Sequence, residues 1–258
     1  QDVPDWLRWN LWLGPAAERP FHSGWLNWHG WREFGTGVLG NWACHEMNLA
    51  FKALKIDSLW SAGAKGHIRL EGEQQIIDRE SFPKWEYVRY EVPERESLPP
   101  VALHWYNGGG GLYEERGARK KLEELVGRPF DWTTEDGDTW DDWAGILLIG
   151  EKGKIYANAH NTTFELLPEG KLEDEAEKVP RTLPRADHFR EWIAACKGGR
   201  RPMSNFDYAG PLAEFALLGN VATLFDGVLE YDPRATKIVN HAGADAALRR
   251  DHRTGWKV

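Results

Sequence analysis

Two neighbouring segments, residues 85–92 and 101–106, constrain the fold of this chain more than any other feature. Both are rich in aromatic and β-branched residues, both alternate along the chain, and a connection that contains prolines joins them. Alternation of this kind predicts strands with one buried face, and the closeness of the two runs predicts a paired unit. Residues 145–150 and 155–159 predict a second hairpin around the turn at residues 151–154.

Segments with helical spacing alternate with these strands. In residues 41–54 apolar side chains recur three and four positions apart, which predicts an amphipathic helix. Asp187 is a suitable N-cap for a second helix, and Asn205 or Asp207 for a third. A further short helix is expected in residues 116–126. Further strands are expected in residues 59–70, 74–78, 163–167, 228–231 and 237–239.

This order of elements predicts an α+β fold, with an open, largely antiparallel β-sheet and helices packed on one face. The sequence contains no linker and no internal repeat, so we expect a single domain over residues 1–258. Within it we expect a Trp-rich loop segment at 1–36, a helix and the sheet at 37–182, and C-terminal helices with a tail at 183–258.

Charge and composition exclude several classes of protein. Lys and Arg number 32 against 40 Asp and Glu, which gives a net charge of −8, and no basic stripe is present. We therefore expect no nucleic-acid partner. Apolar runs fall short of the ~20 residues of a membrane span, so we expect no membrane association and a soluble protein of the cytoplasm or periplasm. Cys44 and Cys196 are predicted to be buried free thiols, and the absence of CxxC and HxxxH argues against a metal site.

A glycine motif, GTGVLG at residues 35–40, matches the GxGxxG pattern and leads into a helix. Asp57 lies about where a ribose-binding acid would be expected. A dinucleotide-binding turn must leave a buried parallel strand, however, and the preceding residues 26–33 form an aromatic loop. We therefore do not expect a phosphate cradle here, although a nucleotide site at this motif remains an alternative.

The helix after the glycine motif carries three polar residues on one face. Asn41, His45 and Asn48 are spaced i, i+4 and i+7 beside the apolar stripe, which places them at the rim of the core. Three hydrogen-bonding groups there are typical of a pocket floor, and His is the side chain best suited to proton transfer near neutral pH. The alternative is a half-buried His45 that bonds a neighbouring carbonyl.

Tryptophan is concentrated at the front of the chain, where eight of the 15 lie in the first 60 residues. Their rings can pack against the C–H faces of sugars, so a Gly- and Pro-rich loop that carries them can line a sugar cleft. Core filling or an oligomer interface is the alternative for each ring. We place Trp12, Trp28 and Arg32 among the candidate substrate-binding residues.

Several separated motifs resemble the Gfo/Idh/MocA family of oxidoreductases, in the subgroup typical of planctomycete and Bacteroidetes sequences. WNLWLGPA at residues 9–16, followed by ERP at 18–20, resembles the signature WDLWLGPAxxRP. Residues 34–48, FGTGVLGNWACHEMN, are similar to the segment GxGxLxDxGxHxxD. The closing segments, FDYAGPLAE, LLGNVA and HRTGW, resemble the last helix and tail of this subgroup.

This resemblance implies the second half of a two-part enzyme. Family members join an N-terminal Rossmann domain, which binds NAD or NADP and carries a catalytic Lys, to an α+β domain for substrate binding and oligomerisation. Only the second part is matched, so we expect a fragment that needs a Rossmann domain as its partner and forms a homo-oligomer through its sheet. The substrate implied is a sugar or sugar derivative.

Residue by residue, the resemblance makes His45 the catalytic residue that helps to move the proton of the substrate hydroxyl. Asn41 and Asn48 stand where the family often has Asp, and an amide can bind substrate or orient His45 but cannot take up a proton. The expected function is therefore substrate binding in an NAD(P)-dependent sugar or polyol oxidoreductase. The alternative is a non-catalytic carbohydrate-binding or scaffold protein that retains this domain.

Overall fold

The computed structural model describes residues 1–75, 78–108, 118–127, 129, 144–179 and 187–256. The chain divides into two compact units, which we describe separately. The first unit contains Gln1–Ala43, Ser58–Arg116 and Phe215–Val258, and the second contains Cys44–Asp57 and Gly117–Glu214. Two helices, α2 (Gly37–Ala53) and α7 (Phe206–Ala222), contribute residues to both units. The single-domain organisation over residues 1–258 stays a prediction.

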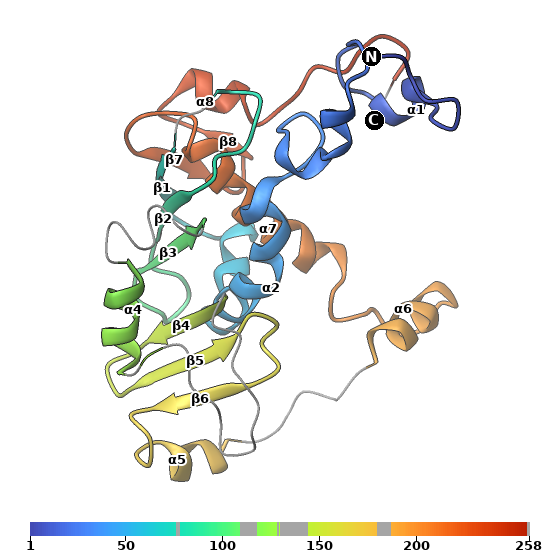
Figure 1. The fold of residues 1–258 in the computed structure, drawn as a ribbon. Coiled ribbons are helices and arrows are strands. Elements are labelled where there is room, and N and C mark those ends of the chain that lie inside the picture. The colour runs from blue at the N-terminus through green and yellow to red at the C-terminus, as the bar shows by residue number, and fades with distance from the viewer. Residues whose placement is uncertain (76–77, 109–117, 128, 130–143, 180–186, 257–258) are drawn as a thin grey trace. The chain divides into compact units, whose positions relative to one another are not determined.

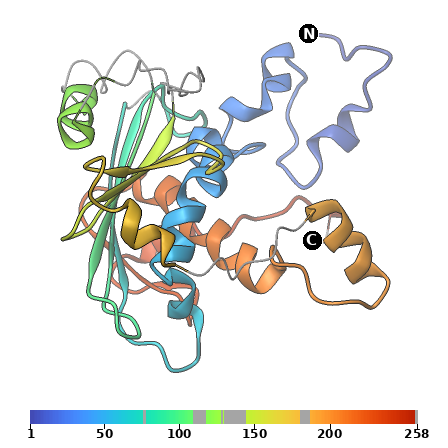
Figure 2. The same ribbon diagram turned by 90° about the horizontal axis from the view of Figure 1, so that it is seen from below.

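A five-stranded antiparallel sheet is the centre of the first unit, and its strands run side by side in both views (Figures 1 and 2). The order of the strands is β3-β2-β1-β7-β8. Their bounds are β1 Ile68–Gln74, β2 Glu86–Val92, β3 Val101–Asn107, β7 Leu229–Asp232 and β8 Lys237–Ile238. The pair predicted from residues 85–92 and 101–106 is confirmed, with Val88 opposite Trp105.

Alternation in β2 gives this sheet one buried face. Val88, Tyr90 and Val92 are buried, whereas the residues between them are partly exposed. The Tyr90 ring lies 4.6 Å from that of Phe215 in α7, and its hydroxyl donates a hydrogen bond of 3.1 Å to the Ala216 carbonyl. At Gly219 a Cβ would overlap the Tyr90 hydroxyl, so this glycine allows the helix to approach the sheet.

The opposite face of the sheet carries charged residues that pair across strands. Arg69 stands opposite Glu91, and Nη1 of Arg69 lies 2.8 Å from Oε2 of Glu91. Arg89 adds an ion pair of 2.7 Å with the same carboxylate. These pairs are partly exposed, so each contributes little to stability, about 0–1 kcal/mol. They favour the register in which the apolar residues face the helices.

The Trp-rich segment of the first unit is held together by its own rings. It contains the short helix α1 (Trp9–Leu13) and the 3₁₀ helices η1 (Ser23–Leu26) and η2 (Trp28–Gly30). Trp9 stacks on Trp12 at 5.0 Å, and the Trp25 and Trp31 rings lie 4.4 Å apart. The Trp9 indole N–H donates to the Arg19 carbonyl, which satisfies its polar end. The segment is therefore a small aromatic cluster.

The second unit contains a three-stranded antiparallel sheet of order β4-β5-β6. Its strands are β4 Gly145–Ile149, β5 Lys154–Asn158 and β6 Phe164–Leu167, which confirms the predicted hairpin and the strand after it. Its other helices are α4 Ala118–Val126, α5 Glu173–Glu177 and α6 His188–Cys196. As predicted, Asp187 caps α6, because its Oδ1 accepts from the N–H groups of Phe189 and Arg190. The described residues also include the helices η3 Ile56–Trp60 and α8 Ala242–Ala246.

Two predictions about local structure are wrong. Residues 59–70 do not form one strand, because η3 continues to Trp60 and the small residues that follow turn at Gly66, which has a φ of +84°. The strand begins only at Ile68. Cys44 and Cys196 are exposed rather than buried, and Cys196 lies on a helix whose apolar side is itself exposed. The strand expected at 74–78 falls partly outside the described residues.

Candidate functional site

The candidate site in the second unit begins with His45 and Asn48 on α2. Met47, Ala50 and Phe51 of this helix are buried, whereas His45 is exposed and Asn48 is half-buried. Burial of the apolar stripe therefore leaves the two polar residues at its edge. Asn41 also lies on α2 and is exposed, but it belongs to the first unit.

A turn between β5 and β6 presents a second histidine. The side-chain Oδ1 of Asn158 accepts hydrogen bonds from the N–H groups of Thr162 and Thr163, at 2.9 and 3.3 Å. The Asn158 carbonyl accepts from the N–H of Asn161. Side chains of Asn commonly close turns in this way, because they replace backbone partners. The turn thus holds His160 and Asn161 in defined positions.

This turn contacts α2 at His45. The ring centroids of His45 and His160 lie 5.3 Å apart with 60° between the planes. The side-chain N–H of Asn161 donates to the His45 carbonyl, and Asn161 itself has a φ of +56°, in the left-handed region that Asn tolerates better than most residues. The structure therefore brings together two imidazoles from distant parts of the sequence.

The sequence contains no local signal for this meeting. His160 lies in a polar turn between two predicted strands, and 116 residues separate His45 from Asn161. Helical spacing can relate His45 only to its neighbours on α2. Asn158 and the threonines after it could have predicted a closed turn, but not which element the turn would contact.

Asn48 is held by Tyr208, a residue of α7 that also belongs to the second unit. The Tyr208 hydroxyl donates a hydrogen bond of 2.5 Å to Oδ1 of Asn48. Burial, with a further effect of Asp57, raises the pKa of Tyr208 to about 12, so the hydroxyl keeps its proton at neutral pH. The Lys52 ammonium lies 4.9 Å from the centre of the Tyr208 ring. Because one end of the Asn48 amide is used in this way, its side chain has a fixed orientation.

Glu46 is the one carboxyl group of this part of α2. Burial raises its pKa to about 8, so it is largely protonated at neutral pH. Consecutive residues of a helix do not face each other, and Glu46 is therefore not a direct partner of His45. A half-buried position disfavours the charged carboxylate, so the neutral form of Glu46 is the one that suits it.

Trp12 and Trp28, two of the predicted substrate-binding residues, lie in the first unit. Trp12 stacks on Trp9 and contacts Phe34 at 4.6 Å, within the aromatic cluster. Trp28 is 49% exposed and stacks on His29 at 4.9 Å. An exposed indole is available to a sugar ring. The substrate contacts expected of both residues stay predictions.

Arg32 is buried, and the first unit supplies its partners. Its guanidinium donates to the carbonyls of Ser81 and Asn220 and, at 2.9 Å, to Oε1 of Gln74. Burial lowers the pKa of Arg32, and Glu86, which is also buried, is the main opposite charge that acts against this shift. These contacts describe an arginine that joins the segment before α2 to the sheet. Its role as a substrate ligand stays a prediction.

The glycine motif at residues 35–40 is filled by side chains of the first unit. A Cβ on Gly37 would lie 2.6 Å from the Phe82 ring, and one on Gly35 would lie 2.7 Å from the Trp28 carbonyl. Helix η2 and an isolated bridge at Trp31 precede the motif in place of a buried strand. The glycines therefore serve close packing at the start of α2, and these residues do not fit a dinucleotide.

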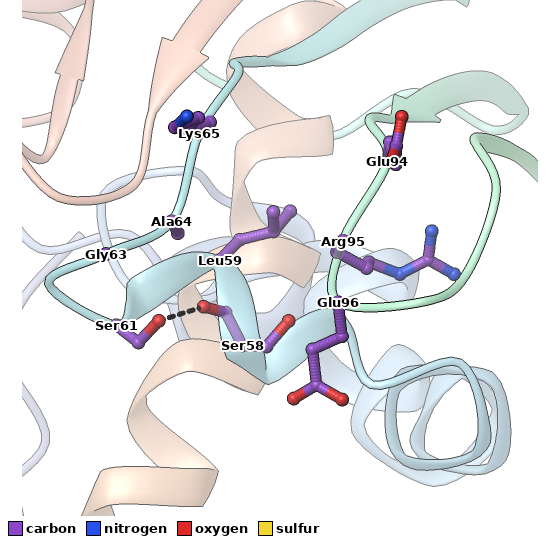
Figure 3. Close-up of a pocket in the computed structure, with 9 residues that line it drawn as sticks. All are labelled: Ser58, Leu59, Ser61, Gly63, Ala64, Lys65, Glu94, Arg95 and Glu96. Carbon is purple, nitrogen blue, oxygen red and sulfur yellow. Dashed lines mark hydrogen bonds between the residues drawn. The ribbon is translucent and has the colours of Figure 1, made fainter.

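The first unit also has an open hollow of about 480 Å³ beside η3 (Figure 3). Figure 3 shows Lys65 and Arg95 pointing away from each other, and Nη1 of Arg95 donates to the carbonyls of Pro93 and Pro99. Glu94 and Glu96 place negative charge on the same walls. Polar groups do not converge on one point here, as they do in a ligand site.

The parts of the chain that the structure describes contain no group of three or more His, Cys, Asp or Glu side chains able to hold a metal ion. They also contain no helix that is both long and apolar enough to cross a bilayer.

Comparison with protein-family models gives no match, and comparison with curated proteins gives none either. The resemblance to the Gfo/Idh/MocA family therefore rests on the motifs of the sequence alone and stays a prediction.

Proposed function

We propose that this chain is the substrate-binding and oligomerisation domain of a Gfo/Idh/MocA-type, NAD(P)-dependent sugar or polyol oxidoreductase. One observation carries the proposal. The segment that resembles the active-site motif of this family forms α2, and its histidine, His45, is exposed beside a second imidazole and close along the helix to a fixed amide. Exposed hydrogen-bonding groups on a rigid helix are suited to binding hydroxyls.

In this proposal His45 handles the proton of the reacting hydroxyl. A neutral imidazole accepts that proton as the hydroxyl carbon is oxidised and returns it in the reverse direction. Asn48 cannot take up a proton, and Tyr208 fixes its amide, so it serves to bind substrate or to orient it. Because the glycine motif does not fit a dinucleotide, we assign NAD(P) binding to a separate Rossmann-type domain.

An exposed apolar helix face supports the proposal of a partner domain. Phe189, Trp192 and Ile193 of α6 are 69%, 66% and 46% exposed and lie on one side of the helix by their spacing. An amphipathic helix normally buries such a stripe. The Rossmann-type domain is the partner that we propose for it.

The outer face of the five-stranded sheet supports the proposal of a homo-oligomer. Tyr87 and His104 are joined by a hydrogen bond of 2.7 Å between the Tyr87 hydroxyl and Nδ1 of His104, and the Tyr106 ring lies 4.9 Å from that of Tyr87. Tyr is enriched in protein interfaces, where its ring is apolar and its hydroxyl finds partners. We place the oligomer contact on this face.

The decisive experiment measures NAD(P)-dependent oxidation of a sugar panel by the full-length protein that contains this chain. His45→Gln should lower kcat by about 10²–10⁴-fold, because it removes the proton acceptor. His67→Gln is the matched control, since His67 lies in the first unit near Glu230 and Asp232 and should leave kcat unchanged. Equal rates for both variants would remove His45 from the reaction. Sugar binding without any turnover would favour the non-catalytic carbohydrate-binding alternative.

A further inference from the structure

The pairing of His45 with His160 goes beyond the motifs that suggested the function. His160 lies in no segment that carries the family resemblance, yet its ring centroid is 5.3 Å from that of His45 and both residues are exposed. We propose that His160 is a second substrate-contacting residue, and that the two imidazoles together bind hydroxyls on two neighbouring carbons of the sugar. This inference rests on the proposed function and names the feature of the substrate that the two histidines recognise.

The fold fixes the position of His160. Asn158 closes the turn from inside with hydrogen bonds to Thr162 and Thr163. Asn161 then ties the turn to the helix through the His45 carbonyl. A binding group needs such support, because a loosely held side chain loses conformational entropy when it binds a ligand.

The turn that carries His160 is attached to α2 at His45 itself. Asn161 adopts a positive φ in order to extend its amide to that carbonyl, and its Oδ1 is buried without a hydrogen-bond partner. An unpartnered buried polar atom is unfavourable by about 1–3 kcal/mol, so a turn that served stability alone would gain from a different residue here. The arrangement is understandable if the turn must hold its neighbour, His160, against His45.

Hydrogen-bond chemistry relates the two rings to a diol. A neutral imidazole has one nitrogen that donates and one that accepts, and a hydroxyl does both. Oxygens on neighbouring carbons lie closer together than the two ring centroids, so each can form a hydrogen bond of about 2.7–3.2 Å with a different ring. A single hydroxyl that bridges the two imidazoles must divide its donor and its acceptors between them. A vicinal diol instead offers each ring an oxygen of its own, and it is therefore the group that we assign to the pair.

The test is a titration of the 258-residue chain observed through the ring nitrogens of its nine histidines by NMR. His45→Gln and His160→Gln assign the two signals, and the probes are myo-inositol, D-glucose and the singly deoxygenated analogue of each. We expect a diol-containing sugar to shift both signals and to bind about 3–10-fold more tightly than its deoxy analogue. His160→Ala, which removes the hydrogen-bonding group, should abolish that ratio, whereas His160→Asn, which keeps a short hydrogen-bonding group, should retain part of it. His67→Gln should change neither the shifts nor the ratio.

The outcomes separate this inference from the proposed function. A shift of His45 alone, or a His160→Ala variant that still distinguishes sugar from deoxy sugar, overturns the diol assignment and leaves the proposed function standing. No shift of either histidine with any of the four sugars overturns both. Shifts of both histidines with the expected ratio support both.

Discussion

The hydroxyl of Tyr208 donates a hydrogen bond of 2.5 Å to Oδ1 of Asn48, and this contact fixes the amide of the candidate site. Tyr208 also packs its ring against Phe51 with centroids 5.8 Å apart, so the hydroxyl has little freedom to choose another partner. The amide of Asn48 is thus oriented before any ligand arrives, which lowers the entropic cost of binding.

Tyr208→Phe tests this contact. The substitution keeps the ring and removes the donor, so we expect the free energy of unfolding to fall by about 1 kcal/mol. Urea denaturation of the wild type, the two single variants with Tyr208→Phe or Asn48→Ala, and the double variant gives the coupling energy between the residues. A coupling energy near zero would show that the hydrogen bond is not formed in solution.

The strands and caps could be predicted because their signals are local. Residues 85–92 alternate in the chain itself, and the sheet then buries Val88, Tyr90 and Val92 on one face. The cap at Asp187 is also decided within a few residues. The position of His45 and Asn48 on a helix follows from the same kind of periodicity. These features need no knowledge of which elements meet.

The remaining features depend on contacts between distant segments. Helix α2 begins at Gly37, four residues before the predicted start, and the Leu39 N–H in its first turn bonds the buried carboxylate of Glu86. No residue near position 37 in the sequence indicates that Glu86 will accept this hydrogen bond. The contact between His160 and His45 could not be predicted for the same reason, because the sequence of a turn does not indicate which helix the turn will contact. Long-range packing decides such matters, and a single sequence does not display it.

Glu46 predicts a pH dependence of stability in the second unit. Its pKa rises from 4.5 to about 8 on folding because burial disfavours the charged form, so the native state holds the proton more tightly than the unfolded chain. The stabilisation is complete below pH 4.5 and disappears as the pH rises toward 8. Glu46→Gln removes the group, and the free energy of unfolding of the variant should therefore rise relative to that of the wild type by about 3–4 kcal/mol between pH 5 and pH 8.

Chemical denaturation at several pH values measures that gain. Glu177→Gln is the matched control, because Glu177 is exposed at the end of α5 and its substitution should produce no trend with pH. A gain of the same size for both variants would assign the effect to net charge. If the difference in the free energy of unfolding between Glu46→Gln and the wild type does not change with pH, the Glu46 carboxyl is exposed to solvent.

Two glycines of α7 predict different effects of the same substitution. A Cβ on Gly219 would overlap the buried Tyr90 hydroxyl, so Gly219→Ala should lower the free energy of unfolding by about 1–3 kcal/mol. A Cβ on Gly210 has open space beyond its own helix, but Pro211 follows and disfavours helical backbone for a residue with a Cβ, which offsets the higher helix propensity of Ala; Gly210→Ala should therefore change the free energy of unfolding by less than about 0.5 kcal/mol. Thermal unfolding of both variants measures the difference. A neutral Gly219→Ala would mean that α7 lies farther from the sheet than described.

The exposed face of α6 predicts that a large aromatic residue can be removed at almost no loss of stability. Trp192 is 66% exposed, so Trp192→Ala should change the free energy of unfolding by less than about 0.5 kcal/mol. Trp105→Ala is the control, because Trp105 is 6% exposed and its loss should destabilise by about 3–5 kcal/mol. Trp192→Ala should also reduce the fluorescence of the apolar dye ANS and weaken binding of the proposed Rossmann-type domain. A large loss of stability with unchanged dye binding would show that α6 buries its apolar stripe within this chain.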